Sequence, residues 1–247
     1  MDLINMLAGD KSALLASGFV DDFNGLNSTD GIWNTLDADS ASAITIDADG
    51  LDGRCQILTG TTDNDEAYLY SMEVAQFLDG KPMIAIARIQ FTEVATDDAN
   101  VIFGIGEGFG AANTLLDGGG GPPADYDGAC FFKVDGGTRW QFETSDGTSQ
   151  ETTDLNVTAG GANFHTLAIE CNPISSTEMV CTPWIDTSGG NNLTQPSEFG
   201  ASSRAPLVQH RDTYAGAGQM AFCVGGKSGG GAAETILVDL AIFRKKR

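Results

Sequence analysis

The chain has 247 residues, with 13 Lys or Arg against 34 Asp or Glu, and its formal net charge is −21. Phosphate binding needs clustered cations, so this balance argues against nucleic acid and anionic membranes as partners. The hydrophobic content of 41% argues against global disorder, and the length suits one large β domain or two small ones.

The first 18 residues differ from the rest of the chain. Asp10 is placed to cap a short helix over residues 11–17, and Gly18 would end it. Such an arm would either pack on its own domain or dock on a neighbouring subunit. The apolar residues that we expect to carry docking are Leu3, Ile4, Leu7, Leu14 and Leu15.

The same N-terminal segment lacks the basic start and the apolar core of a secretory signal. We also find no apolar stretch long enough to span a membrane. We therefore expect synthesis in a cytoplasm and use without export through the secretory route.

Turn signals dominate the rest of the sequence, which contains eight Asp-Gly dipeptides. Asp-Gly favours tight β-turns, because glycine tolerates positive φ and aspartate bonds its own backbone. Short β-rich runs between these turns predict an all-β, two-sheet antiparallel sandwich of the jelly-roll type, as one domain over residues 19–243. The expected strands are residues 19–23, 44–46, 54–58, 67–70, 83–91, 101–106, 129–134, 139–143, 166–171, 179–185, 220–224 and 236–243.

Some of these segments also predict which face of a strand is buried, where a hairpin turns or where a strand lies in its sheet. The odd positions of residues 83–91 are all apolar, which predicts one fully buried face. Asp135-Gly136-Gly137 predicts a hairpin between its two flanking strands. Pro183 lacks an N–H, so its strand should lie at an edge or contain a bulge. Residues 104–127 form a long loop that could bind a ligand, contact a partner or have no fixed structure.

Five cysteines at irregular spacing do not make a disulfide framework, and buried reduced thiols are the expected state. A symmetric turn near Ser176 would place Cys171 opposite Cys181. A cross-strand disulfide between them is the alternative.

Few residues suggest chemistry, and we expect no catalytic site. Asp47, Asp49 and Asp52 resemble a calcium loop, although two consecutive turns explain them better. Calcium is thus the one cofactor that the sequence leaves open. Glu143 and Asp146 have the wrong spacing for the paired carboxylates of a glycosidase. His165 and His210 lack partners at zinc-ligand spacing.

The tryptophans could stack sugars or fill the core. Trp140 shares a strand face with Phe142, which favours the core. Trp33 and Trp184 are the candidates for glycan contact.

Two segments carry a resemblance to known families. His165-Thr166-Leu167-Ala168-Ile169-Glu170, followed by Trp184-Ile185-Asp186, resembles a hairpin of concanavalin A-like and laminin-G-like jelly rolls. Phe164 stands where these families have Trp, and the metal-ligand pattern of the lectins is not recognisable. The opening residues 21–25 with Trp33, and the closing residues 238–243, are similar to the first and last strands of that group.

The chain also resembles virion proteins of tailed phages, through residues 81–91 and the Lys-Val-Asp-Gly-x-Thr-x-Trp pattern of residues 133–140. This resemblance implies a capsid decoration or cement subunit at the virion surface, often a trimer, bound to a major capsid protein or another virion protein. The basic tail, residues 244–247, would then reach a neighbour through Arg244, Lys245, Lys246 and Arg247. The alternatives are a lectin-like glycan-binding module, dependent on calcium or not, and a polysaccharide-degrading enzyme.

Overall fold

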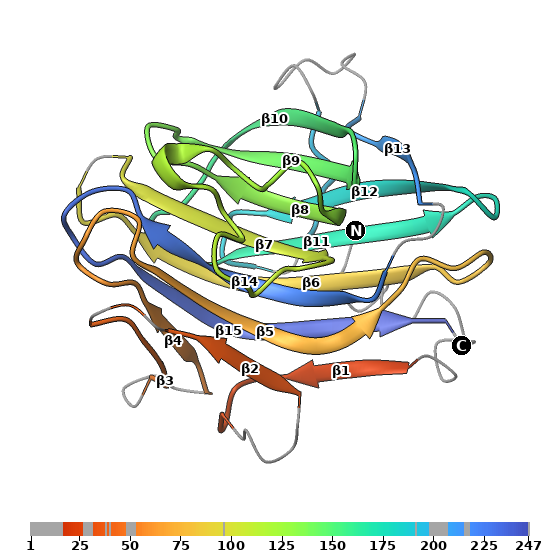
Figure 1. The fold of residues 1–247 in the computed structure, drawn as a ribbon. Coiled ribbons are helices and arrows are strands. Elements are labelled where there is room, and N and C mark those ends of the chain that lie inside the picture. The colour runs from red at the N-terminus through yellow and green to blue at the C-terminus, as the bar shows by residue number, and fades with distance from the viewer. Residues whose placement is uncertain are drawn as a thin grey trace.

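A computed structural model describes residues 17–26, 32–37, 39, 41–47, 53–95, 97–190, 192–197, 207–214 and 218–246. These residues form two antiparallel sheets packed face to face (Figure 1). The two-sheet, all-β architecture expected from the Asp-Gly turns is confirmed. Among the described residues there is no helix long and apolar enough to cross a membrane.

One sheet has eight strands and the other has seven. The eight-stranded sheet runs in the order β13 (His210–Thr213), β12 (Glu178–Asp186), β11 (His165–Pro173), β6 (Met83–Thr92), β15 (Thr235–Lys245), β4 (Cys55–Leu58), β3 (Ala43–Ile46), with β1 (Ser17–Asp21) paired to β15. The seven-stranded sheet runs in the order β10 (Gln150–Thr158), β9 (Arg139–Asp146), β8 (Asp127–Lys133), β7 (Ala99–Gly106), β14 (Met220–Ser228), β5 (Glu66–Ala75), β2 (Trp33–Leu36).

The main core lies between the two sheets. Because side chains alternate across a strand, every second residue of each central strand faces the opposite sheet. In β6 the odd positions from Met83 to Phe91 are all buried, as the sequence predicts. Phe103, Phe131 and Phe222 come from neighbouring strands of the other sheet and pack ring against ring at centroid distances of 5.3–6.2 Å. Burying one such ring contributes about 1.5–3 kcal/mol.

Two predicted hairpins are confirmed. Strands β8 and β9 flank the Asp135-Gly136-Gly137 turn and pair in antiparallel register. In the hairpin of β11 and β12, Cys171 lies directly opposite Cys181. All five cysteines are nevertheless free and buried, so the reduced state is the one observed.

Pro183 sits in a gap of the sheet. On one side it pairs with Ile169 of β11. On the other side, pairing with β13 ends at Cys181 and resumes only at the bridge between Ile185 and Thr194. β12 is therefore not the edge strand that the sequence predicts, because β13 pairs with it, but Pro183 itself lies beyond the residues that pair with β13.

Three strands were missed by the sequence patterns. β2 and β13 are only four residues long, and β10 lies in a stretch of polar residues. β10 is the edge strand of its sheet, and most of its side chains are exposed or half-buried. A strand with so little apolar burial has no alternating pattern to detect.

The two ends of the domain meet at β15. β1 starts at Ser17 and pairs with the last five residues of β15. The predicted helix over residues 11–17, and the arm residues Leu3, Ile4, Leu7, Leu14 and Leu15, lie outside the described residues except for Ser17, which belongs to β1. The last strand was expected to end at Phe243, but it continues through Arg244 and Lys245, so these two residues belong to the sheet and not to a tail. Arg247 lies outside the described residues.

Candidate functional site

Trp33, a candidate for sugar stacking, is a core residue. Its side chain is only 6% exposed and packs against Phe19 and Phe222 at centroid distances of 5.1 and 5.7 Å. Its indole N–H donates to Asp21 Oδ2 at 2.6 Å. The ring has no free face for a ligand, so this prediction was wrong. Trp140 is fully buried, as the sequence favoured.

Trp184 lies on the outer face of the eight-stranded sheet. It is half-buried against an apolar cluster that includes Ile86, Ala168 and Ile242. Its indole N–H donates to Glu170 Oε2 at 3.1 Å. The ring is thus anchored in place, and it lies on a different sheet from Trp33.

Asp47 forms an ion pair with Arg54, with 2.6 Å between Oδ2 and Nη2. Asp49 and Asp52 lie outside the described residues. Among the residues that the structure describes, no group of three or more acidic, His or Cys side chains could hold a metal ion. Calcium binding by this loop therefore stays a prediction.

Both histidines are buried. His165 begins β11 and its Nδ1 accepts the Trp140 indole N–H at 3.0 Å, and burial lowers its pKa. His210 lies between Thr144 and Thr153, with ring-to-hydroxyl distances of 3.3 and 2.9 Å. Burial lowers the pKa of His210 to about 4. Both imidazoles therefore serve the packing of the sandwich.

Glu143 and Asp146 do not form a catalytic pair. Glu143 is 4% exposed and accepts hydrogen bonds from Tyr126, Gln150 and Thr152 at 3.2, 2.9 and 2.5 Å. Burial raises the pKa of its carboxyl group. Asp146 lies three positions further along β9, and residues an odd number apart on a strand face opposite sides. The spacing argument from the sequence is confirmed.

The loop of residues 107–126 covers the outer face of the seven-stranded sheet. Phe109, Leu115 and Tyr126 are at most 4% exposed and form a second apolar cluster with Tyr68, Ile102, Cys130, Phe132 and Cys223 of the sheet. The ring centroids of Phe109 and Tyr126 lie 4.9 Å apart, with the ring planes tilted by 32°. A Cβ at Gly106 would lie 2.8 Å from the Phe109 ring, so the glycine lets the loop approach. The loop is therefore a packed part of the fold.

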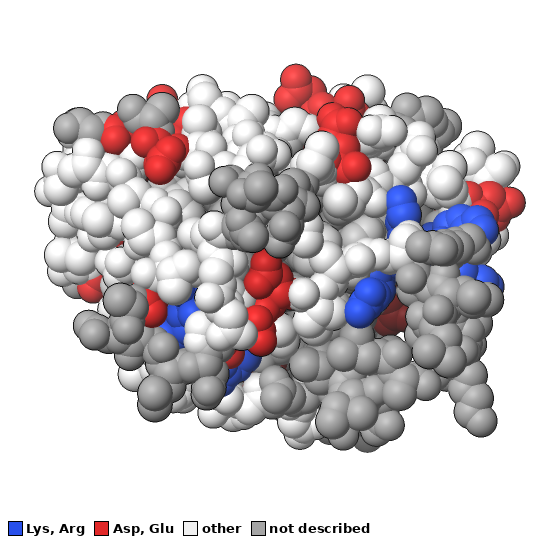
Figure 2. All heavy atoms as spheres, turned by 90° about the horizontal axis from the view of Figure 1, so that it is seen from below, with Lys and Arg blue, Asp and Glu red and all other residues white. Residues whose placement is uncertain are grey.

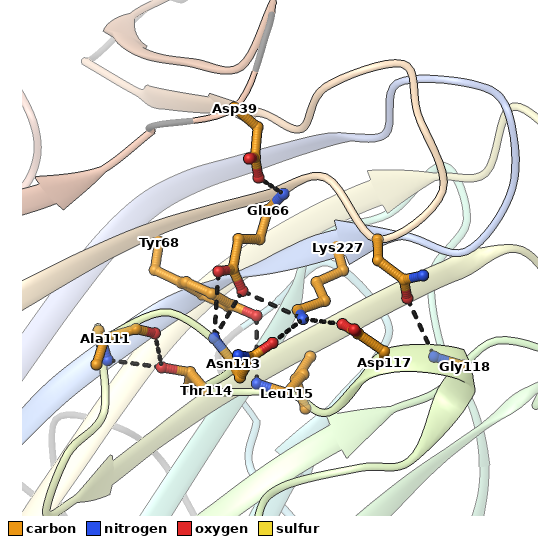
Figure 3. Close-up of polar contacts among 12 residues, drawn as sticks. Asp39, Glu66, Tyr68, Ala111, Asn113, Thr114, Leu115, Asp117, Gly118 and Lys227 are labelled. Carbon is orange, nitrogen blue, oxygen red and sulfur yellow. Dashed lines mark hydrogen bonds and ion pairs between the residues drawn. The ribbon is translucent and has the colours of Figure 1, made fainter.

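A buried lysine fastens this loop to the sheet (Figure 3). Lys227 of β14 is 1% exposed, and its ammonium group lies 2.9 Å from Asn113 Oδ1, 2.7 Å from Asp117 Oδ1 and 3.4 Å from Glu66 Oε2. Glu66 in turn accepts the Asn113 backbone N–H at 3.0–3.1 Å. The ammonium group thus donates two hydrogen bonds and has a further ion-pair partner in Glu66, so Lys227 holds structure and is not a free nucleophile.

Beside the fastened loop lies an open hollow of about 480 Å³. Its walls come from β2, β5, the loop and the start of β14. Tyr70 and Met72 supply apolar surface, while Asn34, Glu73 and Gln219 supply polar groups. The complete lining is Asn34, Tyr70, Ser71, Met72, Glu73, Gly108, Phe109, Gly110, Ala111, Gln219 and Ala221.

The sequence patterns did not indicate this hollow. Its polar residues are far apart in the chain, and β2 was not recognised as a strand. Only the pairing of Asn34 with Tyr70, and of β14 with β5, brings them to one surface. The Gly108-Phe109-Gly110 run is the one local signal, because it permits a loop to lie flat on a sheet.

Comparison with known proteins gives no family model and no curated relative that matches the chain. Solved structures do match over nearly the whole length. The metal-free carbohydrate recognition domain of Emp46p is 12% identical with a TM-score of 0.56, covering 90% of this chain and 93% of that domain. An endo-1,3-β-glucanase from Streptomyces sioyaensis is 14% identical with a TM-score of 0.57, covering 94% and 96%. An endo-β-1,4-glucuronan lyase from Trichoderma reesei is 10% identical with a TM-score of 0.57, covering 91% and 94%.

The fold is a concanavalin A-like jelly roll. At these identities the likeness shows the fold alone, because one fold supports many functions. The named structures include a lectin domain and two enzymes, so the expectation of a non-enzyme stays a prediction. None of the three is described as a virion protein, and the virion role also stays a prediction.

Proposed function

We propose that the protein is a lectin-like glycan-binding module and that the hollow beside the loop is its binding site. The observation that carries this proposal is the hollow itself. Its amide, carboxylate and aromatic groups lie together on one exposed surface that the core does not need. Carbohydrates present both hydroxyl groups and apolar C–H faces, and this lining offers partners for both.

The polar groups of the hollow offer different hydrogen-bonding capacities to a ligand. Asn34 and Gln219 are exposed, and each carries an amide that both donates and accepts hydrogen bonds. Glu73 is exposed and supplies two acceptor oxygens. Met72 is 57% exposed and offers apolar surface to the C–H face of a sugar. The two glycan candidates expected from the sequence, Trp33 and Trp184, have no part in this site.

Binding explains the hollow better than hydrolysis does. Glycosidases need two carboxylates about 5–9.5 Å apart. Glu73 is the one carboxylate among the described residues that line the hollow.

Glycan-array binding followed by calorimetric titration of the best ligand tests the proposal. Replacing Asn34 and Gln219 together with Ala should weaken binding at least tenfold. The matched control is Asn163→Ala, which removes an exposed amide elsewhere on the surface. Trp184→Ala should leave the affinity unchanged. Equal affinity in the wild type and the double variant would refute the site.

Two additional experiments distinguish glycan binding from the alternative functions. Titration with calcium and with a chelator tests for a metal in the Asp47 loop. Incubation of the bound oligosaccharide, followed by chromatography, tests for cleavage. Stable glycan supports the binding module, and release of shorter products would favour an enzyme. Absence of any glycan ligand, together with binding to a capsid lattice, would favour the virion role.

A further inference from the structure

Two oppositely charged patches lie at one end of the sandwich. At this end β5 and β15 finish and β6 begins, since Met83 pairs with Lys245. β9 also finishes here, where Asp146 pairs with Asp127. The Thr213 hydroxyl donates to Asp146 Oδ2 at 2.6 Å and joins the ends of the two sheets.

The basic patch consists of Lys81, Arg244, Lys245 and Lys246. The backbone N–H of Lys246 donates to Pro82 O at 3.0 Å, which places the last residues of β15 beside the start of β6. Lys245 Nζ donates to Val74 O at 2.7 Å. Figure 2 shows most of the Lys and Arg surface of this view at its right-hand end, where Figure 1 places the C-terminus.

No residue of the basic patch forms an ion pair within the described part of the chain. Every other Lys or Arg that the structure describes does form one. These pairs are Arg54–Asp47, Arg88–Asp239, Lys133–Glu93, Arg139–Asp154, Arg211–Glu178 and Lys227 with Glu66 and Asp117. In a chain of net charge −21, four cations without a carboxylate partner among the described residues are unexpected at one end. Asp79, close in sequence to Lys81, also forms no ion pair with a described cation.

The acidic patch consists of Glu107, Asp127, Asp146 and Asp212. No described Lys or Arg forms an ion pair with any of the four. Burial and then the neighbouring Glu107 and Asp146 raise the pKa of Asp127. The patch therefore concentrates negative charge that no described Lys or Arg neutralises through an ion pair.

Exposed apolar side chains accompany the two patches. Leu78 is 47% exposed, and its backbone O accepts the Lys81 N–H at 3.0 Å. Ile174 is 49% exposed and directly follows β11, whose end lies beside the start of β6. Protein–protein interfaces usually combine such apolar side chains with polar and charged ones.

We propose that two copies of the chain associate through this end about a two-fold axis, with the basic patch of each facing the acidic patch of the other. A two-fold interface uses the same surface on both copies and must complement itself. This end satisfies that condition, because it carries both signs of charge: the basic residues lie on or beside β6 and β15 of the eight-stranded sheet, Glu107, Asp127 and Asp146 lie on or beside the seven-stranded sheet, and Asp212 lies on β13 of the eight-stranded sheet. A free polyanion would satisfy the basic patch but be repelled by the acidic one. A second copy is the partner that matches both.

The net charges of two copies repel at long range, whereas the patches attract at short range. This difference gives the association a distinctive salt dependence. At about 0.01 M ionic strength the screening length is about 30 Å, so the net charges of two copies repel over the whole molecule. Near 0.15 M it falls to about 8 Å, which suppresses the long-range repulsion and preserves close contacts between patches. At about 1 M it is about 3 Å and the patches are screened too. Association should therefore be greatest at intermediate salt.

The test is the native mass of the full chain by sedimentation at these three ionic strengths, with glycan absent. We expect two-chain particles near 0.15 M and mostly single chains at either extreme. Lys81→Glu with Lys246→Glu should weaken association at least tenfold, as should Glu107→Lys with Asp212→Lys. Mixing the two double variants should restore a two-chain particle, because each then complements the other.

Arg139→Glu is the control for a charge reversal at the opposite end, where β9 begins, and should leave the mass unchanged. A single chain at all three salt concentrations would overturn the proposal. A two-chain particle that persists at about 1 M salt and in both double variants would also overturn it. The same holds for a trimer, the state expected from the sequence resemblance, that persists under these conditions. These mass measurements do not involve glycan, so failure of this proposal is distinguishable from failure of the proposed function.

Discussion

The backbone of Gly110 lies directly on the ring of Tyr70. A Cβ built at Gly110 would meet the ring atoms of Tyr70 at 2.2–2.6 Å, and Gly110 has a φ of +88°. This contact sets how closely the loop of residues 107–126 approaches β5. It thereby forms one wall of the hollow, whose lining includes both residues.

Gly110→Ala should lift the loop from the sheet. Any non-glycine residue at this φ costs about 1–2 kcal/mol, and the clash with Tyr70 adds about 1–3 kcal/mol. Gly108→Ala is the matched control, because Gly108 has a φ of +75° but no atom within 4 Å of its added Cβ. Hydrogen exchange at the Leu115 amide, which donates to Tyr68 Oη, should accelerate more in Gly110→Ala. Equal exchange in both variants would show that the contact does not hold the loop.

Lys227→Met should destabilise the fold by about 3–5 kcal/mol, because it leaves Glu66 charged and buried without its partner. Adding Glu66→Gln to this variant should recover part of the loss. Arg139→Met removes a half-exposed pair and should cost at most about 1 kcal/mol. Urea unfolding measures the free energy of unfolding of all three variants. Losses of similar size for Lys227 and Arg139 would contradict the role assigned to the buried network.

His210 should make stability depend on pH. Its pKa is about 4 in the folded chain, against about 6.5 in the unfolded chain. Between these values only the unfolded chain takes up the proton, so the fold loses stability as the pH falls from about 6.5 to 4. The total loss from this residue is about 3 kcal/mol.

Carboxyl groups with raised pKa values, such as Glu143, act in the opposite direction, so the difference between variants is the useful quantity. The free energy of unfolding of His210→Gln should fall less between pH 7 and pH 5 than that of the wild type. Parallel pH profiles for the two proteins would show that His210 does not titrate as described.

The sequence predicts those parts of the fold whose evidence is local. The Asp135-Gly136-Gly137 turn, the alternation in β6 and the opposed Cys171 and Cys181 depend on neighbouring residues, and the structure confirms them. Asp127-Gly128 lies inside strand β8 and forms no turn, so the dipeptide alone does not decide. The hollow depends on pairings between distant strands, including the short β2, and so it had no local pattern. Trp33 was wrongly chosen for the same reason, because only its contacts with Phe19 and Phe222 show that it is buried.

The central claim is that the hollow binds glycan, and chemical-shift mapping during an oligosaccharide titration tests it most directly. The account predicts that the largest shifts fall on the amides of residues 70–73, 108–111 and 219, and that Asn34 and Gln219 side-chain amides shift with them. Saturating shifts confined to another surface, such as the outer face of the eight-stranded sheet around Trp184, would contradict it.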